Sequence, residues 1–190
     1  MSALRAEPPS AVVVRLNEML VELAQAVGDD RQTSDADRID RIAVLEKLAA
    51  ASAALQVAES VRFAQSQVAE QLAADVHPDK IGRGIAEQIG LACRISPVAA
   101  ARRLNTARAL WFELPDTYAQ LAAGELSARL AETIVSETRH LDPETRGQVD
   151  TQLAAARIWR LGFKAATACV RKFTYQADRE GYLRRGRTER

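Results

Sequence analysis

A run of about forty residues without glycine or proline constrains the fold of this chain more than any other feature. Neither residue occurs from Asp35 to Asp75, and alanine, leucine, glutamate, arginine and glutamine dominate the composition, all of which favour helix. The sequence therefore predicts a single helix of about 60 Å over this range. Such a helix is longer than a compact domain needs, so we expect part of it to pack against another helix or another chain.

The apolar residues of the long helix form an irregular stripe, in which Ser52 and Glu59 interrupt the heptad pattern. A coiled-coil hairpin with the preceding helix and a homodimer through the long helix are both compatible with this stripe. Its apolar positions are Ile39, Ile42, Leu45, Leu48, Leu55, Val61, Val68 and Leu72.

The rest of the chain predicts shorter helices between turn residues. Only nine glycines and six prolines occur, and no segment alternates apolar and polar residues for long. We therefore predict an all-α protein built as a multi-helix bundle. The expected organisation is an N-terminal helix and loop over residues 1–34, a helical domain over 35–178, and a basic tail over 179–190. Besides the long helix and the element at 85–110, the predicted helices span residues 11–27, 116–123, 128–140, 143–161 and 163–175.

The stretch over residues 85–110 predicts a short helix, a sharp turn and a second helix. Ser96 is a good N-cap and Pro97 a good first helical residue, because Ser accepts from unpaired amides and Pro has no amide to leave unpaired. Small and apolar residues form the expected inner face of the second helix, namely Ala100, Leu104, Ala107 and Trp111. The opposite face carries Arg102, Asn105 and Thr106, with Arg103 and Arg108 on its flanks.

A helix with these two faces can pack on a core while it reaches into a DNA groove. Recognition helices of helix-turn-helix proteins have this pattern. Ordinary solvated helices of arginine-rich proteins have it too, so the pattern alone leaves both interpretations open.

The charge distribution favours the nucleic-acid interpretation, although the net charge of +1 does not. Residues 81–110 hold five Lys and Arg against one acidic residue, and residues 157–190 hold ten against three. These segments could attract phosphate backbones, or they could simply pair with the acidic segments 1–80 and 111–156. The candidate nucleic-acid-binding residues are Arg83, Arg94, Ser96, Arg102, Arg103, Asn105, Thr106, Arg108, Lys164, Arg171 and Lys172, with Arg102 and Asn105 as the candidates for base edges.

No catalytic or metal-binding pattern is recognisable. Cys93 and Cys169 are far apart, and His77 and His140 sit at predicted helix ends without ligand spacing. The sequence contains no GxSxG, HExxH or Gly-rich phosphate loop. We therefore expect no enzymatic activity, no metal and no cofactor. Because there is no signal-peptide core and no membrane-spanning run, we expect a cytoplasmic protein with two buried free thiols and no membrane contact.

Several of these segments together resemble a known family, the domain of unknown function 222, which is the module of the 13E12-repeat proteins. The most specific parts are the run GRG–helix–SP–helix and the run LP…LAAGELS, and the resemblance covers about residues 40–190. The segments that carry it are Arg62–Gln71, Gly82–Leu104, Leu114–Pro115, Leu121–Leu126 and Ala131–Thr138.

The resemblance implies an all-helical fold and a nucleic-acid context. In that family the module commonly precedes a C-terminal HNH nuclease domain that cleaves DNA. This chain stops at Arg190 without an HNH motif, so we expect a naturally short relative or a fragment of a longer nuclease, and no catalytic residue is assigned. Two functions remain in competition: a non-catalytic DNA-binding or DNA-positioning module, and a helical dimerisation or protein-interaction module without direct nucleic-acid contact. A third hypothesis, an enzyme in its own right, has no motif in its favour.

Overall fold

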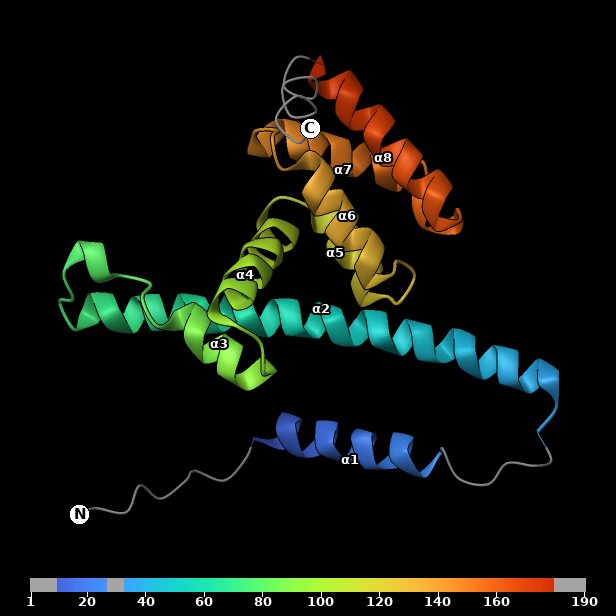
Figure 1. Cartoon of the computed structure of the whole chain (residues 1–190), viewed down its shortest axis with the longest axis horizontal. Helices are drawn as coiled ribbons and strands as arrows, with labels where there is room; N and C mark the ends of the chain where they lie inside the picture. Colours follow the sequence, from blue (N-terminus) through green and yellow to red (C-terminus); the bar gives the residue numbers. More distant parts are fainter. Residues whose placement is uncertain (1–9, 27–32, 180–190) are drawn as a thin grey trace. The chain divides into compact units, whose positions relative to one another are not determined.

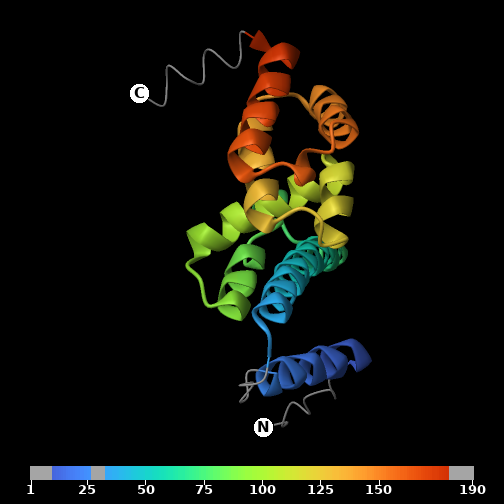
Figure 2. The same cartoon turned by 90° about the vertical axis from the view of Figure 1, so that its right-hand side faces the viewer.

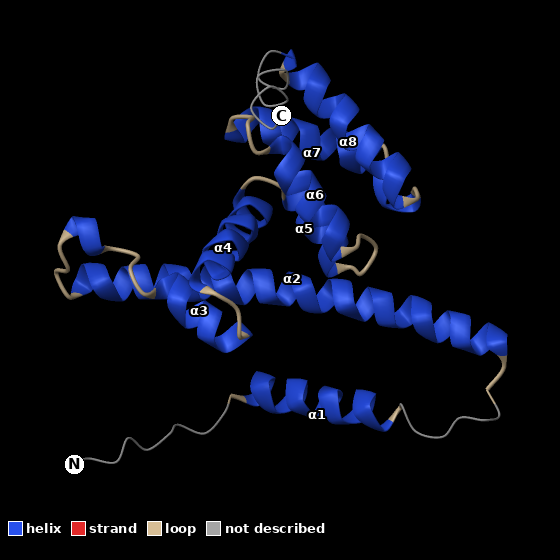
Figure 3. Ribbon diagram, viewed as in Figure 1, coloured by secondary structure: helices blue, strands red, loops and turns tan. Residues whose placement is uncertain are grey.

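The computed structural model describes residues 10–26 and 33–179, and every regular element in these ranges is helical (Figures 1 and 3). The predicted all-α class is confirmed. Within these ranges no helix is long and apolar enough to cross a membrane. The helices are α1 (Ala11–Gln25), α2 (Asp35–Ala73), α3 (Ile85–Cys93), α4 (Pro97–Phe112), α5 (Pro115–Ala122), α6 (Ala128–Thr138), α7 (Pro143–Ala155) and α8 (Phe163–Ala177), with 3₁₀ turns η1 (Pro78–Lys80) and η2 (Ile158–Arg160).

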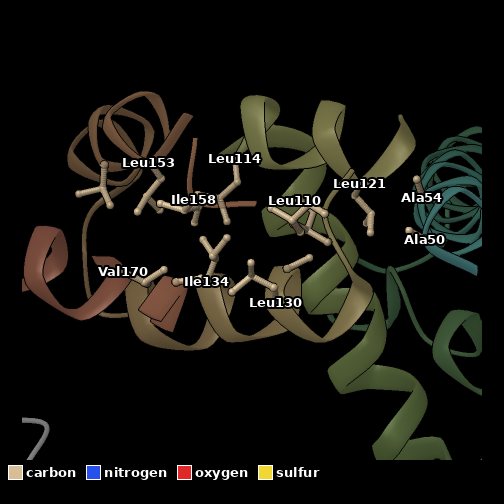
Figure 4. Close-up of a cluster of buried hydrophobic side chains, with 14 of the residues drawn as sticks. Ala50, Ala54, Leu110, Leu114, Leu121, Leu130, Ile134, Leu153, Ile158 and Val170 are labelled. Atoms are coloured by element: carbon tan, nitrogen blue, oxygen red, sulfur yellow. The ribbon is translucent and has the colours of Figure 1, made fainter. Parts of the chain in front are cut away.

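The chain divides into two compact units, residues 1–41 and residues 42–190. In the second unit, the remainder of α2 supports a stack of shorter helices, and α8 lies at the end of the stack farthest from α2 (Figures 1 and 2). One hydrophobic core runs through this stack from α2 to α8 (Figure 4). Its largest fully buried side chains include Leu110, Leu114, Leu121, Ile134, Leu153, Ile158 and Val170.

The long helix packs through small residues, and this corrects the predicted stripe. Small side chains let two helix backbones approach closely, so a buried helix face can consist of alanines. Of the eight large apolar residues expected along the stripe, only Val61 is buried, and Leu45 is 52% exposed. The buried residues of α2 lie three or four positions apart on one face, namely Ala50, Ala54, Ala58, Val61 and Ala64.

The turn between α5 and α6 lies directly against α2. Gly124 in this turn has a φ of +74°, and a Cβ atom added to it would come within 2.9 Å of the carbonyl oxygen of Lys47. Only glycine combines this backbone conformation with so close an approach. Lys47 also pairs with Glu125 of the same turn, at 3.1 Å between Nζ and Oε1.

Several helix ends differ from the predicted boundaries, and three of them differ in ways that matter for the fold or the described range. The helix predicted over 143–161 ends at Ala155, because Arg157 takes a left-handed conformation with φ 49° and the chain turns there. This turn places Ile158 in the core at 1% exposure. The long helix ends at Ala73 and the first helix at Gln25, while Val27, the predicted end of the first helix, lies outside the described residues.

Asp150 of α7 caps the N-terminus of α5 from a different helix. The N-cap residue of α5, Leu114, has no side-chain acceptor for the first amides of the helix. The Asp150 carboxylate accepts from the backbone N–H of Asp116 at 2.8 Å and of Thr117 at 3.1 Å, and from the Thr117 hydroxyl. Burial raises the pKa of the Asp150 carboxyl above its ordinary value, and the hydrogen bonds from Thr117 and Asp116 oppose that rise. Asp150 thereby fixes α5 to α7.

Arg146 of α7 is a buried cation that joins three helices. Its Nη1 atom donates to Glu113 at the end of α4 at 2.7 Å, and its Nη2 atom donates to the carbonyl of Val135 in α6 at 2.8 Å. Its Nε atom donates to the hydroxyl of Thr138 at 2.9 Å. Each nitrogen of the guanidinium therefore has a partner, which a buried charge requires.

We expect Asp150→Ala to lower the free energy of unfolding by roughly 2–3 kcal/mol, because the amides of Asp116 and Thr117 lose their acceptor inside the protein. Urea denaturation followed by circular dichroism measures this change. The matched control is Asp142→Ala, which removes the exposed cap of α7. It should cost less, because water can take over the freed amides, and an equal or larger cost for the control would contradict the prediction.

Arg146→Ala should lower the free energy of unfolding by roughly 3–5 kcal/mol, because it leaves Glu113 and the Val135 carbonyl without their donor. Lys47→Ala is the control: it removes an ion pair between distant elements that is about half exposed. An exposed pair contributes at most about 1 kcal/mol. Thermal and chemical denaturation measure the free energy of unfolding of both variants. A similar loss of free energy in the two would refute the role assigned to Arg146.

Candidate nucleic-acid interface

The stretch from Ile85 to Phe112 forms a helix–turn–helix element, as predicted. The nine-residue α3 and the sixteen-residue α4 are joined by a turn of three residues, a length typical of DNA-binding helix pairs. Ser96 is the N-cap of α4, and its hydroxyl oxygen accepts from the backbone N–H of Ala99 at 3.2 Å. Pro97 is the first residue of the helix. Both predicted signals at this helix start are confirmed.

The turn follows from the way in which α3 ends. Arg94 has φ 55° and ψ 43°, the left-handed conformation that closes many helices. The N–H of Ile95 donates to the carbonyl of Gly90 at 2.9 Å, and the N–H of Arg94 donates to that of Leu91 at 3.3 Å. These two bonds pair the last carbonyls of α3 and direct the chain into α4.

Gly90 sets the distance between α3 and α4. A Cβ atom at this position would lie 3.1 Å from the carbonyl oxygen of Ile95 and 3.3 Å from the Cβ of Ala100. The close packing of the two helices therefore depends on the missing side chain of Gly90 and on the small side chain of Ala100. This close packing also fixes which face of α4 points toward solvent.

The inner face of α4 agrees with the prediction. Ala100, Leu104 and Ala107 are buried, while Trp111 is half-buried. The Trp111 ring packs edge-on against Tyr118, with 5.2 Å between the ring centroids, and the guanidinium of Arg62 lies 5.6 Å from it. Trp111 thus joins α4 to α2 and α5 at the rim of the core.

The predicted outer face of α4 divides into two sides. Arg102, Asn105 and Arg108 are spaced three residues apart and are exposed, so they form one surface. Arg103 and Thr106 instead line a hollow between α2, α4 and α6, where Thr106 is half-buried. In this hollow Arg103 donates a hydrogen bond to the side chain of Gln56 on α2.

The remaining candidates lie in two places. Arg83 precedes α3, and Arg94 lies in the turn after it; both are exposed. Lys164 and Lys172 are exposed on α8, the helix that lies farthest from α2 in the stack (Figure 1). Arg171, also on α8, donates to the buried carboxylate of Glu137 at 3.1 Å. The cations of residues 81–110 therefore gather around α3 and α4, and those of α8 belong to a separate helix.

The cations around α3 and α4 are not neutralised by neighbouring carboxylates. Among residues 10–26 and 33–179, no ion pair includes any of the five arginines of this segment. The simple pairing of acidic with basic helices, which the charge distribution left open, therefore does not hold for this surface. These arginines are Arg83, Arg94, Arg102, Arg103 and Arg108.

Gln71 holds the basic loop before α3, a role that was not predicted. Its Oε1 atom accepts from the N–H of Gly82 at 2.6 Å, and its Nε2 atom donates to the carbonyl of Arg83 at 3.1 Å. These bonds fasten the loop to α2 and hold Arg83 next to α3. No local sequence signal indicates this contact, because Gly82 and Arg83 lie eleven and twelve residues after Gln71 and come near it only through the intervening turn.

Comparison with known proteins gives one match, which covers most of the chain. The model of the family described as "Domain of unknown function (DUF222)" matches residues 42–190. The chain belongs to this family. No curated protein and no solved structure matches the chain.

The DUF222 match begins within α2 and includes the whole element α3–α4, whereas α1 lies outside it. It agrees with the resemblance seen over about residues 40–190. The part of this DUF222 protein that the structure describes contains no group of three or more histidine, cysteine, aspartate or glutamate side chains that could hold a metal ion. Cys93 and Cys169 are both free thiols, and both are half-buried rather than fully buried as expected.

Gly90→Val should lower the free energy of unfolding by roughly 2–3 kcal/mol, because the added atoms would press on the Ile95 carbonyl and on Ala100. Ala92→Val is the matched control: it places the same branched side chain at an exposed position of α3. It should cost about 0.5 kcal/mol through helix propensity alone. Urea denaturation of the two variants tests this, and equal stability of both would show that α3 and α4 are not closely packed at Gly90.

Proposed function

We propose that this DUF222 protein is a non-catalytic DNA-binding or DNA-positioning module, and that α4 is its recognition helix. The observation that carries the proposal is the exposed side of α4 with Arg102, Asn105 and Arg108, which sits on the second helix of a helix–turn–helix element. No described carboxylate pairs with these two arginines. The surface therefore keeps its positive charge for a polyanion.

The side chains on this surface have chemistry suited to base edges. An arginine can donate two hydrogen bonds to a guanine in the major groove, and an asparagine can both donate to and accept from an adenine. Arg102 and Asn105 are three residues apart on α4, so one approach of the helix brings both to neighbouring bases. Val98, which is 63% exposed, lies one turn before Arg102 and could contact a thymine methyl group.

Other cations of the same element suit contacts to phosphate. Arg83 is held by the Gln71-bound loop, and Arg94 occupies the turn between the helices. Phosphate contacts position a protein on DNA without reading its sequence, and they make the affinity depend on salt. In this proposal, Arg83 and Arg94 set the position of α4 on the duplex, while Arg102 and Asn105 provide the preference for particular bases.

A specific observation also favours the competing proposal, a protein-interaction module. Large apolar side chains are exposed along the first half of α2, with Ile39 65% and Ile42 61% exposed. Exposed apolar surface of this kind often marks a contact with another protein. A homodimer through the long helix therefore stays a prediction, and it is compatible with DNA binding by α4.

Replacement of Arg102 and Asn105 by alanine should weaken binding to duplex DNA about tenfold or more, because each good base contact contributes roughly 1–3 kcal/mol. Fluorescence anisotropy at low salt measures the affinity for a labelled duplex that the wild-type protein enriches from a random-sequence pool, because the base contacts form only on a preferred sequence. For the wild-type protein, the affinity should fall steeply as salt is added.

Arg160→Ala is the matched control for this experiment. It removes one exposed arginine outside the α3–α4 element and should change the affinity little. The absence of any complex with duplex or single-stranded DNA at low salt would rule out the proposal. An equal loss of affinity in the control would show that binding is spread over the surface and is not centred on α4.

A further inference from the structure

The helix α1 has no buried residue, although most of its residues are apolar. It runs for fifteen residues from Ala11 to Gln25 behind the cap Ser10, and a helix of this length is marginal in water on its own. A second surface that covered its apolar residues would stabilise it. The large apolar side chains of α1 are exposed by 39–63%, namely Val12, Val13, Val14, Leu16, Met19, Leu20, Val21 and Leu23.

Four of these residues form a continuous seam along α1. Val12, Leu16, Met19 and Leu23 are spaced by four, three and four residues, which is the spacing of a helix that packs lengthwise against another. The order of spacings is the same from either end. Two antiparallel copies would therefore place Val12 against Leu23 and Leu16 against Met19, and a two-fold axis would repeat each contact.

The charged residues beside the seam select this antiparallel arrangement. Arg15 and Glu22 are seven residues apart, so they lie on the same flank of the seam. In an antiparallel pair the same flanks face each other, and Arg15 would meet Glu22 of the second copy twice. In a parallel pair this flank would face the opposite one, which carries the apolar residues Val13 and Leu20.

We propose that α1 is a self-association helix that binds α1 of a second copy of this chain in an antiparallel pair. The four seam residues and the flanking Val13 and Leu20 are about half exposed and contribute about 50 Å² each, so the six from each copy would bury about 600 Å² in total, which is small for a stable interface. The dimer is therefore weak and forms only as the protein concentration rises. The proposal does not depend on DNA binding, and it places the contact outside the matched DUF222 region.

Light scattering on the full 190-residue chain tests this proposal without DNA. The average mass should rise from that of a monomer at ~1 µM toward that of a dimer at ~100 µM. Arg15→Glu should weaken the association about tenfold, because it replaces two attractive contacts by two repulsive ones. Glu22→Arg should have the same effect, and the double exchange Arg15→Glu with Glu22→Arg should restore the association.

Two controls verify that a weaker association comes from the loss of this contact. Asn17→Arg adds a charge to α1 on the side opposite the flank of Arg15 and Glu22 and should leave the association unchanged. Circular dichroism on every variant verifies that the helical domain stays folded.

Three outcomes would overturn the proposal. The first is a monomer at all concentrations, which would mean that α1 has no partner copy. The second is failure of the double exchange to restore association. The third is a dimer that responds to Leu48→Glu on α2 and not to Arg15→Glu, which would place the interface on the long helix.

Discussion

The buried guanidinium of Arg146 is the interaction on which the arrangement of the shorter helices depends. It joins the end of α4, through Glu113, to α6 and to its own helix α7. A charge in the interior is tolerated only when its donors are paired, so the three helices must keep their relative positions. Asp150, one turn further along α7, adds a second link by capping α5. One side of α7 thus fixes three neighbouring helices by polar contacts within a largely apolar core.

These links have a consequence for α4, the helix to which we assign DNA recognition. Its C-terminal end is held by Glu113 and Arg146, and its N-terminal end packs against Gly90 of α3. A helix held at both ends cannot rotate freely about its axis. The side with Arg102 and Asn105 is therefore presented in one orientation, which a recognition helix needs if its side chains are to meet base edges without further ordering.

The packing of α2 through alanines explains why so much apolar surface remains outside the core. Ala50, Ala54 and Ala58 face the other helices, and their small size lets the backbones come close. The leucines and isoleucines of α2, together with the apolar residues of α1, are exposed instead. Large apolar side chains normally enter a core. Those that stay exposed on α1 form the surface through which we propose that the protein self-associates.

The sequence by itself determined the helices and most of their beginnings, because caps such as Ser96, Ser127 and Asp142 and prolines such as Pro97 act within a few residues. It also predicted the inner face of α4, since helical spacing alone decides which residues share a side. Only the tertiary structure decided that α2 buries alanines, that Arg103 turns toward Gln56, and that Arg146 and Asp150 hold the bundle together. Each of these depends on residues far apart in the chain, and local patterns do not encode which distant partner a side chain will meet.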